Sequence, residues 1–215
     1  SYQAPADFCV CVFDPVGKTF RDEIFSSYKA NRSSMPSDLA VQIPVIFNLI
    51  QALGWPIIQK DGYEADDVIG SLVRSAESVS LVSTIISGDK DLAQLVNSKT
   101  RMIDTMSRGS SGITIVDEAA VIKKYGVQPS EMVDFLTLVG DPVDNIPGVP
   151  KVGPKTASRL ISTFGSLTNI IENIDKIPGV IGENLRTSKD WLPIGKSLVS
   201  IKTDLDLEVS SKKCF

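Results

Sequence analysis

Four groups of carboxylates stand out along this 215-residue chain, and each lies beside a predicted strand end or tight turn. They are Asp14; Glu64, Asp66 and Asp67; Asp89 and Asp91; and Asp141 and Asp144. The sequence contains no histidine, which excludes Ser-His and Cys-His nucleophilic catalysis and a His-ligated zinc site. Converging carboxylates would repel one another and raise their pKa values, and their hard oxygen atoms favour Mg²⁺ or Mn²⁺. Two such ions can activate water and stabilise the leaving oxygen in phosphodiester hydrolysis.

Each carboxylate group also has a simpler structural explanation. Asp14 precedes a proline and suits a turn, and the acids at 64–67 suit the first turn of a helix, where the helix dipole favours them. An Asp-x-Asp such as 89–91 is common in turns, and the acids at 141–144 can be solvated residues of a Pro/Gly loop. The repetition of acids at equivalent ends of predicted parallel strands favours a shared site, because ligands bind at that edge of α/β sheets.

Apolar runs and helical patterns predict the elements that would position these acids. Strands are predicted at 8–13, 55–59 and 81–87, and a hairpin at 101–116. Helices are predicted at 38–53, 64–78, 117–125, 130–139, 156–164 and 185–198, with prolines inside the first and last, and residues 202–209 are predicted to be extended. The pattern indicates an α/β fold with one large domain, or a core domain with a smaller appendix.

Two stretches suit binding to a polyanion. The first, residues 17–36, interleaves basic and aromatic side chains, which fits phosphate tracking and base stacking, although a solvated amphipathic helix explains it too. The second, Gly140–Ala157 (GDPVDNIPGVPKVGPKTA), predicts a hairpin that opens a helix and offers backbone N–H groups to a phosphate. Residues 61–144 carry 14 acidic against 7 basic side chains, and residues 146–202 carry 8 basic against 4 acidic ones. An acidic centre beside a basic flank suits a metal-dependent enzyme acting on a polyanion.

Several observations concern the cellular setting. No apolar run approaches 18 residues, so we expect no membrane span, and the N-terminal residues lack the pattern of a signal peptide. The three cysteines, Cys9, Cys11 and Cys214, form an odd and sparse set, which suggests a reducing compartment.

The motifs together resemble the 5′-nuclease domain of bacterial DNA polymerase I over nearly the whole chain. The matching stretches are VFDPVGKTFRDE, YKANRSSMP, GYEADDVIG, SGDKDLAQLV, KYGVQPSEMVDFLTLVGDPVDNIPGVPKVGPKTA and IKTDLDLE. The resemblance implies a PIN-like/flap-endonuclease core with a mostly parallel central sheet, and a helix–three-turn–helix (helix-hairpin-helix-like) module that grips duplex DNA. It also implies 5′→3′ exonuclease and flap endonuclease activity with two divalent ions. The implied domains are residues 1–130, a core with a basic arch-like segment at 15–36, and residues 131–215.

The resemblance also implies roles for individual residues. By that similarity Asp14, Glu64 and Asp66 serve the first metal, Asp66, Asp89, Asp91 and Asp144 serve the second, and Asp67 and Asp141 lie in the inner or second shell. Lys29 and Arg32 contact the scissile phosphate and act with Asp66 in catalysis, and Arg21 and Tyr28 bind DNA beside them. The hairpin, with Gly148, Lys151, Gly153, Lys155 and Thr156, binds the duplex backbone and can hold K⁺.

One departure from the family pattern concerns the start of the chain. The family begins with a strand whose terminal Asp ligates the first metal, and that strand is not found before Asp14. We therefore expect a fragment or a natural short form, or else a first metal that is held more weakly. The leading hypothesis is a monomeric Mg²⁺-dependent 5′ nuclease acting on flaps or on nicked or RNA-primed duplexes. It would act in the bacterial cytoplasm or a DNA-containing organelle. The alternative is a structure-specific DNA-binding protein that cuts weakly or not at all. A PIN-like ribonuclease is disfavoured by the hairpin at 146–157.

Overall fold

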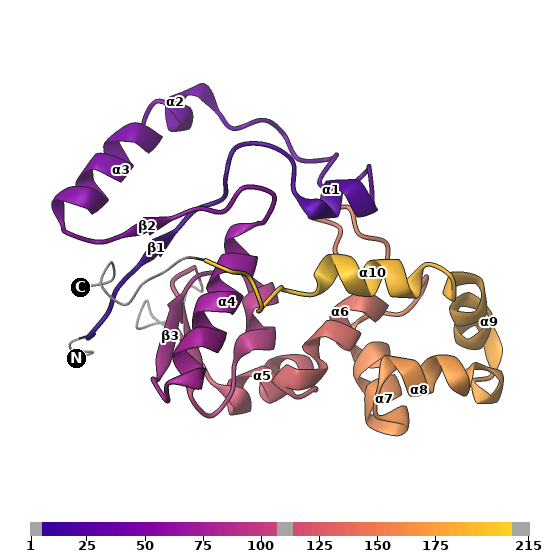
Figure 1. The fold of residues 1–215 in the computed structure, drawn as a ribbon. Helices are drawn as coiled ribbons and strands as arrows, with labels where there is room; N and C mark the ends of the chain where they lie inside the picture. Colours follow the sequence, from indigo (N-terminus) through magenta and orange to yellow (C-terminus); the bar gives the residue numbers. More distant parts are fainter. Residues whose placement is uncertain (1–5, 107–113, 208–215) are drawn as a thin grey trace.

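The computed structural model describes residues 6–106 and 114–207, which form an α/β structure (Figure 1). The strands are β1 (Cys11–Val12), β2 (Ile57–Ile58), β3 (Ser83–Ile86), β4 (Thr100–Asp104) and β5 (Thr114–Val116). β1 pairs with β2 in parallel, β3 with β4 in parallel, and β4 with β5 antiparallel. Pairing is therefore mostly parallel, as predicted. The expected single central sheet is divided, because within the described residues no ladder joins β1–β2 to β3–β4–β5.

Helices make up most of the remaining regular structure. They are α1 (Phe20–Ile24), α2 (Ser37–Ala40), α3 (Ile43–Ala52), α4 (Ala65–Ser78), α5 (Glu118–Tyr125), α6 (Met132–Val139), α7 (Pro154–Phe164), α8 (Leu167–Glu172), α9 (Gly179–Ser188) and α10 (Leu192–Val199), with 3-10 helices at Lys90–Leu95, Pro129–Glu131 and Ile174–Lys176. α4 packs against both β1 and β3, so one helix covers parts of both sheets. None of the helices in the described part of the chain is long and apolar enough to cross a membrane.

Two predicted helices are each divided in the structure. The helix expected at 38–53 separates into α2 and α3, with Pro44 in the first turn of α3. The helix expected at 185–198 separates into α9 and α10, with Pro193 in the first turn of α10. Proline lacks the N–H that a helix interior needs, whereas the first turn tolerates it, so each proline marks a helix start. The turn of the predicted hairpin at 101–116 and the end of the predicted extended segment at 202–209 lie partly outside the described residues.

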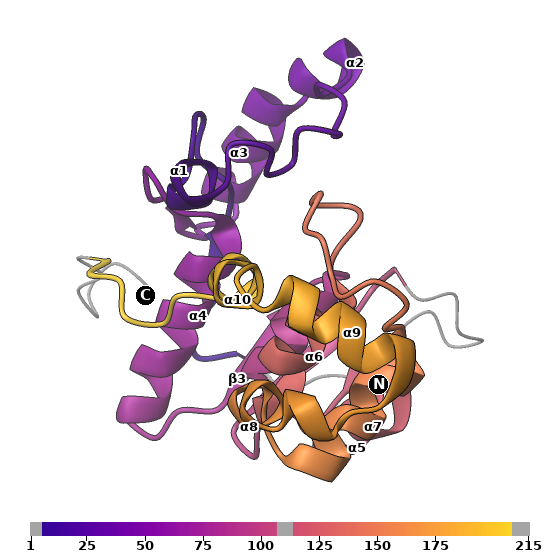
Figure 2. The ribbon, with the colours of Figure 1, turned by 90° about the vertical axis from the view of Figure 1, so that its right-hand side faces the viewer.

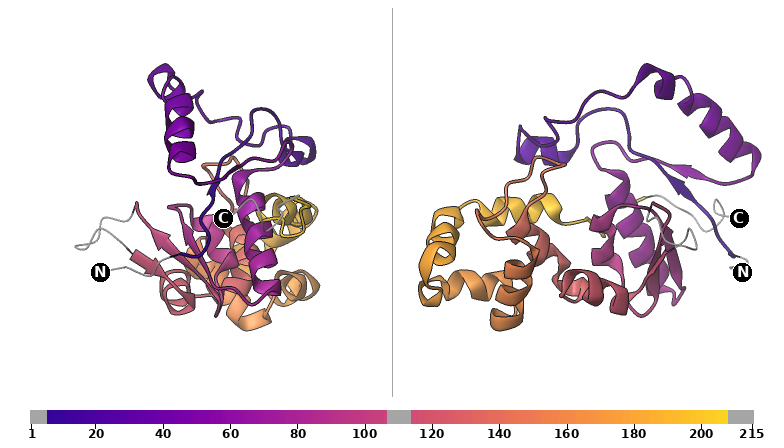
Figure 3. Two further views of the ribbon diagram at one scale, coloured as in Figure 1. Left: turned by 60° about the vertical axis from the view of Figure 1, so that its left-hand side comes forward. Right: turned by 180° about the vertical axis from the view of Figure 1, so that it is seen from behind.

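The core is built mainly by helices that follow the sheets in the chain. Met132 and Leu138 of α6 are fully buried, and α7 and α10 pack on α6. Figure 2 shows α10 beside α4, with α7 and α8 below them. By contrast, α3 has no buried residue, and α2 and α3 project from the body as an arm (Figure 3). The core therefore joins the helical half of the chain to α4, where two of the predicted metal ligands lie.

Candidate active site

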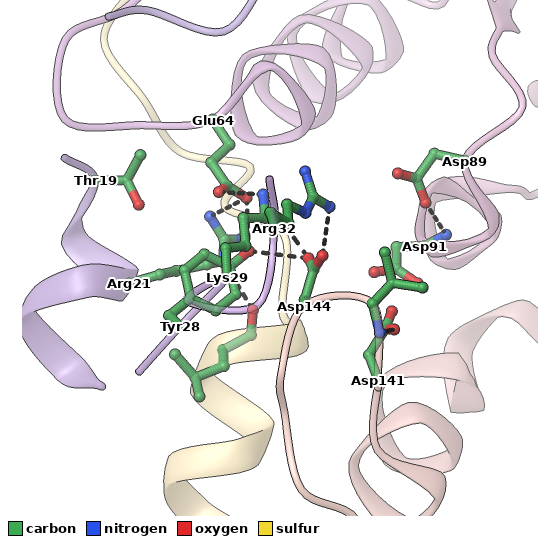
Figure 4. A network of polar contacts seen from close by, with 12 residues as sticks. Thr19, Arg21, Tyr28, Lys29, Arg32, Glu64, Asp89, Asp91, Asp141 and Asp144 are labelled. Atoms are coloured by element: carbon green, nitrogen blue, oxygen red, sulfur yellow. Dashed lines mark hydrogen bonds and ion pairs between the residues drawn. The ribbon is translucent and has the colours of Figure 1, made fainter. Parts of the chain in front are cut away.

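Six of the eight predicted carboxylates line one small polar pocket, together with basic and aromatic residues of the predicted arch-like segment. Figure 4 shows part of this site, with Glu64 and Asp144 beside Lys29 and Arg32. The six are Asp14, Glu64, Asp66, Asp89, Asp91 and Asp144. They come from the end of β1, the start of α4, the turn after β3 and the loop after α6. Arg21, Tyr28, Lys29 and Arg32 line the same pocket. The fold thus brings four separate stretches of sequence to one place.

The tightest carboxylate cluster contains Asp91, Asp141 and Asp144. One oxygen of each lies within 4.8 Å of the others. Asp141 is positioned by a pair of 2.8 Å backbone hydrogen bonds with Ile146, which close the turn that carries Asp144. The Lys90 Nζ lies 2.5 Å from Asp141 Oδ2 and 3.5 Å from Asp91 Oδ1. Lys90 compensates only part of the negative charge of this cluster.

Burial and mutual repulsion change the acidity of two of these groups. The pKa of Asp66 is raised to about 7 by burial and by the charges of Asp89, Asp91, Glu64 and Asp14. The pKa of Asp91 is raised to about 6 by burial, and the charge of Lys90 opposes that shift only in part. Among the described residues, Asp91 Oδ1 is a buried side-chain oxygen without a hydrogen-bond donor. Because a cation among these oxygens would relieve both desolvation and repulsion, the donor set fits hard divalent ions such as Mg²⁺ or Mn²⁺.

Cationic side chains of the segment after α1 form ion pairs with the carboxylates of the pocket. Lys29 Nζ lies 2.5 Å from Glu64 Oε1 and 3.8 Å from Asp144 Oδ2, and Arg32 forms an ion pair with Asp144. The backbone N–H of Lys29 also donates to the carbonyl of Asp144 (2.9 Å). The Arg32 side chain is about half exposed, at 47%, so it can also reach a ligand that approaches from solvent.

Tyr28, which is predicted to bind DNA, lies at the pocket wall but is almost fully buried. It is 5% exposed, and its hydroxyl donates to Glu64 Oε2 at 3.0 Å and lies 3.2 Å from Asp144 Oδ2. Burial and the two neighbouring carboxylates raise its pKa, so the hydroxyl keeps its proton. Tyr28 therefore links two predicted metal ligands from different parts of the chain.

Arg21, which is predicted to bind DNA, and Asp67, which is predicted to lie in the inner or second shell of a metal, are buried as well. Asp67 is 0% exposed and Arg21 is 2% exposed. Arg21 forms a fork with Asp67, through Nη1–Oδ2 at 2.6 Å and Nη2–Oδ1 at 2.9 Å. Asp67 does not line the carboxylate pocket, whereas Arg21 lies at its wall with Nη1 also 3.4 Å from Glu64 Oε2.

The predicted DNA-binding hairpin divides into an exposed part and a packed part. Lys151, Gly153 and Lys155 are exposed, and Gly153 is the residue before α7. Gly148 instead packs against the backbone at the end of α6, where a Cβ would lie 2.6 Å from the amide nitrogen of Gly140. Thr156 is half-buried, and its N–H donates to the carbonyl of Gly153 (3.0 Å). The exposed residues can meet a phosphate backbone, whereas Gly148 serves close packing.

The structure also reveals site residues that the sequence prediction missed. Lys90 lies between Asp89 and Asp91 in the sequence, and that position in an acidic turn was the available signal. Asn31 donates to the carbonyl of Pro142 (2.7 Å) and Asn145 to that of Ser27 (2.6 Å). These last two join the arch-like segment to the loop after α6, and no local sequence pattern predicts such a long-range contact.

Comparison with known proteins places this geometry in a family. The sequence model of the 5′-3′ exonuclease N-terminal resolvase-like domain matches residues 1–126. The sequence model of the 5′-3′ exonuclease C-terminal SAM fold matches residues 127–215. The chain belongs to the 5′-3′ exonuclease family. This confirms the resemblance that the motifs indicate, and the family models meet at 126/127 rather than at the predicted boundary of 130/131.

Individual family members support the same assignment. The chain is 44% identical to a 5′-3′ exonuclease of Buchnera aphidicola subsp. Baizongia pistaciae, over 97% of this chain and 70% of that protein. It is 42% identical to DNA polymerase I of Pseudomonas aeruginosa, over 99% of this chain but only 24% of the polymerase. The chain therefore spans about a quarter of the polymerase relative.

Solved structures confirm the fold. A T5 5′-exonuclease structure with bound zinc superposes with a TM-score of 0.75 at 22% identity, covering 90% of this chain and 74% of the phage protein. The catalytic core of Rad2 in complex with a DNA substrate superposes with a TM-score of 0.56 at 18% identity, covering 91% of this chain and 65% of the Rad2 chain. The predicted α/β flap-nuclease fold with a helical C-terminal part is thus confirmed.

Proposed function

We propose that this protein is a structure-specific 5′ nuclease that hydrolyses DNA phosphodiesters at 5′ ends and flaps with the help of divalent metal ions. The observation that carries the proposal is the convergence of six carboxylates with Lys29 and Arg32 in one pocket, in a chain of the 5′-3′ exonuclease family. No observation favours the alternative of a DNA-binding protein that cuts weakly.

The carboxylates would hold two ions, Mg²⁺ or Mn²⁺. We assign Asp14, Glu64 and Asp66 to one and Asp66, Asp89, Asp91 and Asp144 to the other, with Asp141 supporting the second. When bound, such ions lower the pKa of a coordinated water and neutralise charge on a phosphate. The raised pKa values of Asp66 and Asp91 support this assignment, since a cation is the partner that these buried acids require.

Lys29 and Arg32 would bind the phosphate that is cleaved. Both are cationic and lie at the edge of the carboxylate pocket, where they can orient the phosphate and stabilise its negative charge. Asp66 would act beside them, because it lies close enough to the other acids to be affected by four of their charges. Tyr28 would keep Glu64 and Asp144 at a fixed separation rather than contact DNA.

The hairpin before α7 would bind the duplex beside the cleavage site. Lys151 and Lys155 are exposed, and the N-terminal end of α7 attracts an anion. We further propose that K⁺ can bind within this hairpin. The substrates would be flapped, nicked or RNA-primed duplexes bound by a monomer. Cys9 and Cys11 are both free, which suits action in a reducing compartment such as bacterial cytoplasm or a DNA-containing organelle.

Cleavage of an end-labelled 5′-flap duplex tests the proposal. The wild type is compared with the Asp91→Ala variant, with and without Mg²⁺, and with Asp175→Ala as the control, since the Asp175 side chain is 92% exposed and lies outside the pocket. We expect metal-dependent cleavage near the junction by the wild type and the control, and a loss of at least about 100-fold in Asp91→Ala. A wild type that binds the flap but does not cut it, in either Mg²⁺ or Mn²⁺, would refute the proposal.

A further inference from the structure

The extended segment at 200–205, which follows α10, docks along α4, the helix whose start carries Glu64 and Asp66. The N–H of Lys202 donates to Asp67 Oδ1 (2.9 Å), and the N–H of Leu205 donates to Ser71 Oγ (3.1 Å). Gly70 lies under the segment so closely that a Cβ there would come within 2.6 Å of the Ile201 Cγ2 and 2.7 Å of the Lys202 carbonyl oxygen. The docking is therefore specific, with main-chain hydrogen bonds and a glycine that leaves room for the segment.

The Arg21–Asp67 pair lies at the centre of this contact. Besides the fork to Asp67, Arg21 donates through Nε to the carbonyl of Leu198 (2.8 Å) and through Nη2 to that of Ser200 (2.9 Å). Asp67 also accepts the backbone N–H of Glu64 (3.0 Å), the residue that caps α4. Burial alone would lower the pKa of Arg21, but the hydrogen bond and charge of Asp67 raise it, so the guanidinium keeps its charge.

This pair joins three parts of the candidate active site. Arg21 belongs to α1, which precedes the segment with Lys29 and Arg32, and Asp67 belongs to the first turn of α4. The segment at 200–205 continues from α10, which packs on α6, and the loop after α6 carries Asp144. Figure 2 shows α1 and α10 next to the start of α4. The pair thus links the elements that carry the phosphate-binding cations with those that carry both groups of metal ligands.

We propose that Arg21 and Asp67 are positioning residues that set the start of α4 against α1 and α10, and so fix the separation between Glu64 and Asp144. This inference rests on the proposed nuclease function. Arg21 lies at the wall of the pocket, with Nη1 3.4 Å from Glu64 Oε2, and because both residues are almost fully buried we assign their contacts to the protein rather than to substrate. Buried ion pairs are weak evidence for stability, because desolvation offsets their attraction. A geometric role explains why a pair with hydrogen bonds to α4, α10 and the segment after it lies at this junction. Misplacement of a catalytic group by about 1 Å can reduce a rate about 100-fold.

The test uses three variants of the full chain. Arg21→Lys keeps the charge but cannot form the fork, and Asp67→Asn keeps the shape of the side chain. Gly70→Ala changes no charge and pushes the segment away from α4. Arg74→Lys is the matched control, because Arg74 lies on the same helix with its side chain 74% exposed. For each protein kcat and KM are measured on a flap duplex, and hydrogen exchange is measured at the N–H groups of Lys202 and Leu205.

Arg21→Lys, Asp67→Asn and Gly70→Ala are expected to lower kcat by about 10- to 100-fold with KM changed less than about threefold, and to speed exchange at both amides. The control is expected to match the wild type. A pair that only stabilises the fold would lower the melting temperature and leave kcat unchanged well below it. If the wild type cuts and the folded Arg21→Lys and Gly70→Ala variants have an unchanged kcat, the positioning inference is overturned while the proposed nuclease function stands. If the wild type itself does not cut, the proposed function fails. Unchanged exchange in the variants overturns the inference whether or not the wild type cuts.

Discussion

Gly148 and Gly153 lie in the same hairpin, yet replacement by alanine is expected to have different effects at the two positions. A Cβ at Gly148 would lie 2.6 Å from the nitrogen of Gly140 and closer still to the carbonyl oxygen of Val139, whereas ordinary contacts begin at 3.4 Å. The obstructing atoms belong to backbone, so the hairpin must move away from the end of α6. At Gly153 the backbone φ is −93°, and no atom lies within 4 Å of the added Cβ.

The size of the effect at Gly148 follows from two terms. Overpacking costs about 2 kcal/mol. The movement also weakens the hydrogen bond from Val149 N–H to the carbonyl of Leu138 (2.8 Å), which is worth about 1 kcal/mol. We therefore expect Gly148→Ala to lower the free energy of unfolding by about 3 kcal/mol. Gly153→Ala should lower it by no more than about 1 kcal/mol, the difference between glycine and alanine at a helix N-cap.

Urea denaturation followed by tryptophan fluorescence measures both effects. Trp191 reports on the hairpin directly, since its indole N–H donates to the carbonyl of Pro147 (2.7 Å). Equal losses in the two variants, or a Gly148→Ala protein as stable as the wild type, would refute the close-packing argument. Binding to a duplex separates the roles further. In Gly153→Ala the new methyl group lies at the start of α7, so this variant should bind DNA more weakly while it stays folded.

Three further predictions concern other parts of the molecule. Asp66 binds its proton more tightly in the folded protein than in the unfolded chain, so its contribution to the free energy of unfolding should fall as pH rises from about 4 to about 7. Urea titrations at several pH values, with EDTA present, measure this dependence. Asp66→Asn should remove the contribution of Asp66 to the change of unfolding free energy with pH. Asp117 caps α5 by accepting the N–H of Ala120 (2.8 Å), and Asp117→Ala should cost about 1 kcal/mol in the same assay, so no change would contradict the cap. Lys155→Ala should weaken duplex binding and reduce the slope of log Kd against log salt concentration by about 0.9, with Kd measured by fluorescence anisotropy. An unchanged slope would show that Lys155 makes no phosphate contact.

Much of the fold could be predicted because local patterns agree with the final structure. The helix over 117–125 ends at Gly126, whose φ of 73° favours glycine, and the predicted strand at 81–87 contains β3. Prediction was less accurate where tertiary packing sets the boundaries. The run at 8–13 forms a ladder only at Cys11–Val12, because a strand extends only as far as its partner β2 allows. Likewise, the helix-like pattern at 38–53 could not show where α2 ends and α3 begins.

The sequence by itself determined the kind of chemistry. The absence of histidine and the four groups of acids indicate a metal-dependent site, and the motifs resemble those of the 5′-nuclease domain of bacterial DNA polymerase I. Only the tertiary structure decided which polar residues face the pocket. Asp66 and Asp67 are neighbours on one helix turn, but successive side chains on a helix point in different directions. Asp66 therefore lies among the acids, whereas Asp67 pairs with Arg21 under the segment at 200–205. No local pattern contains that difference, because the partners come from distant parts of the chain.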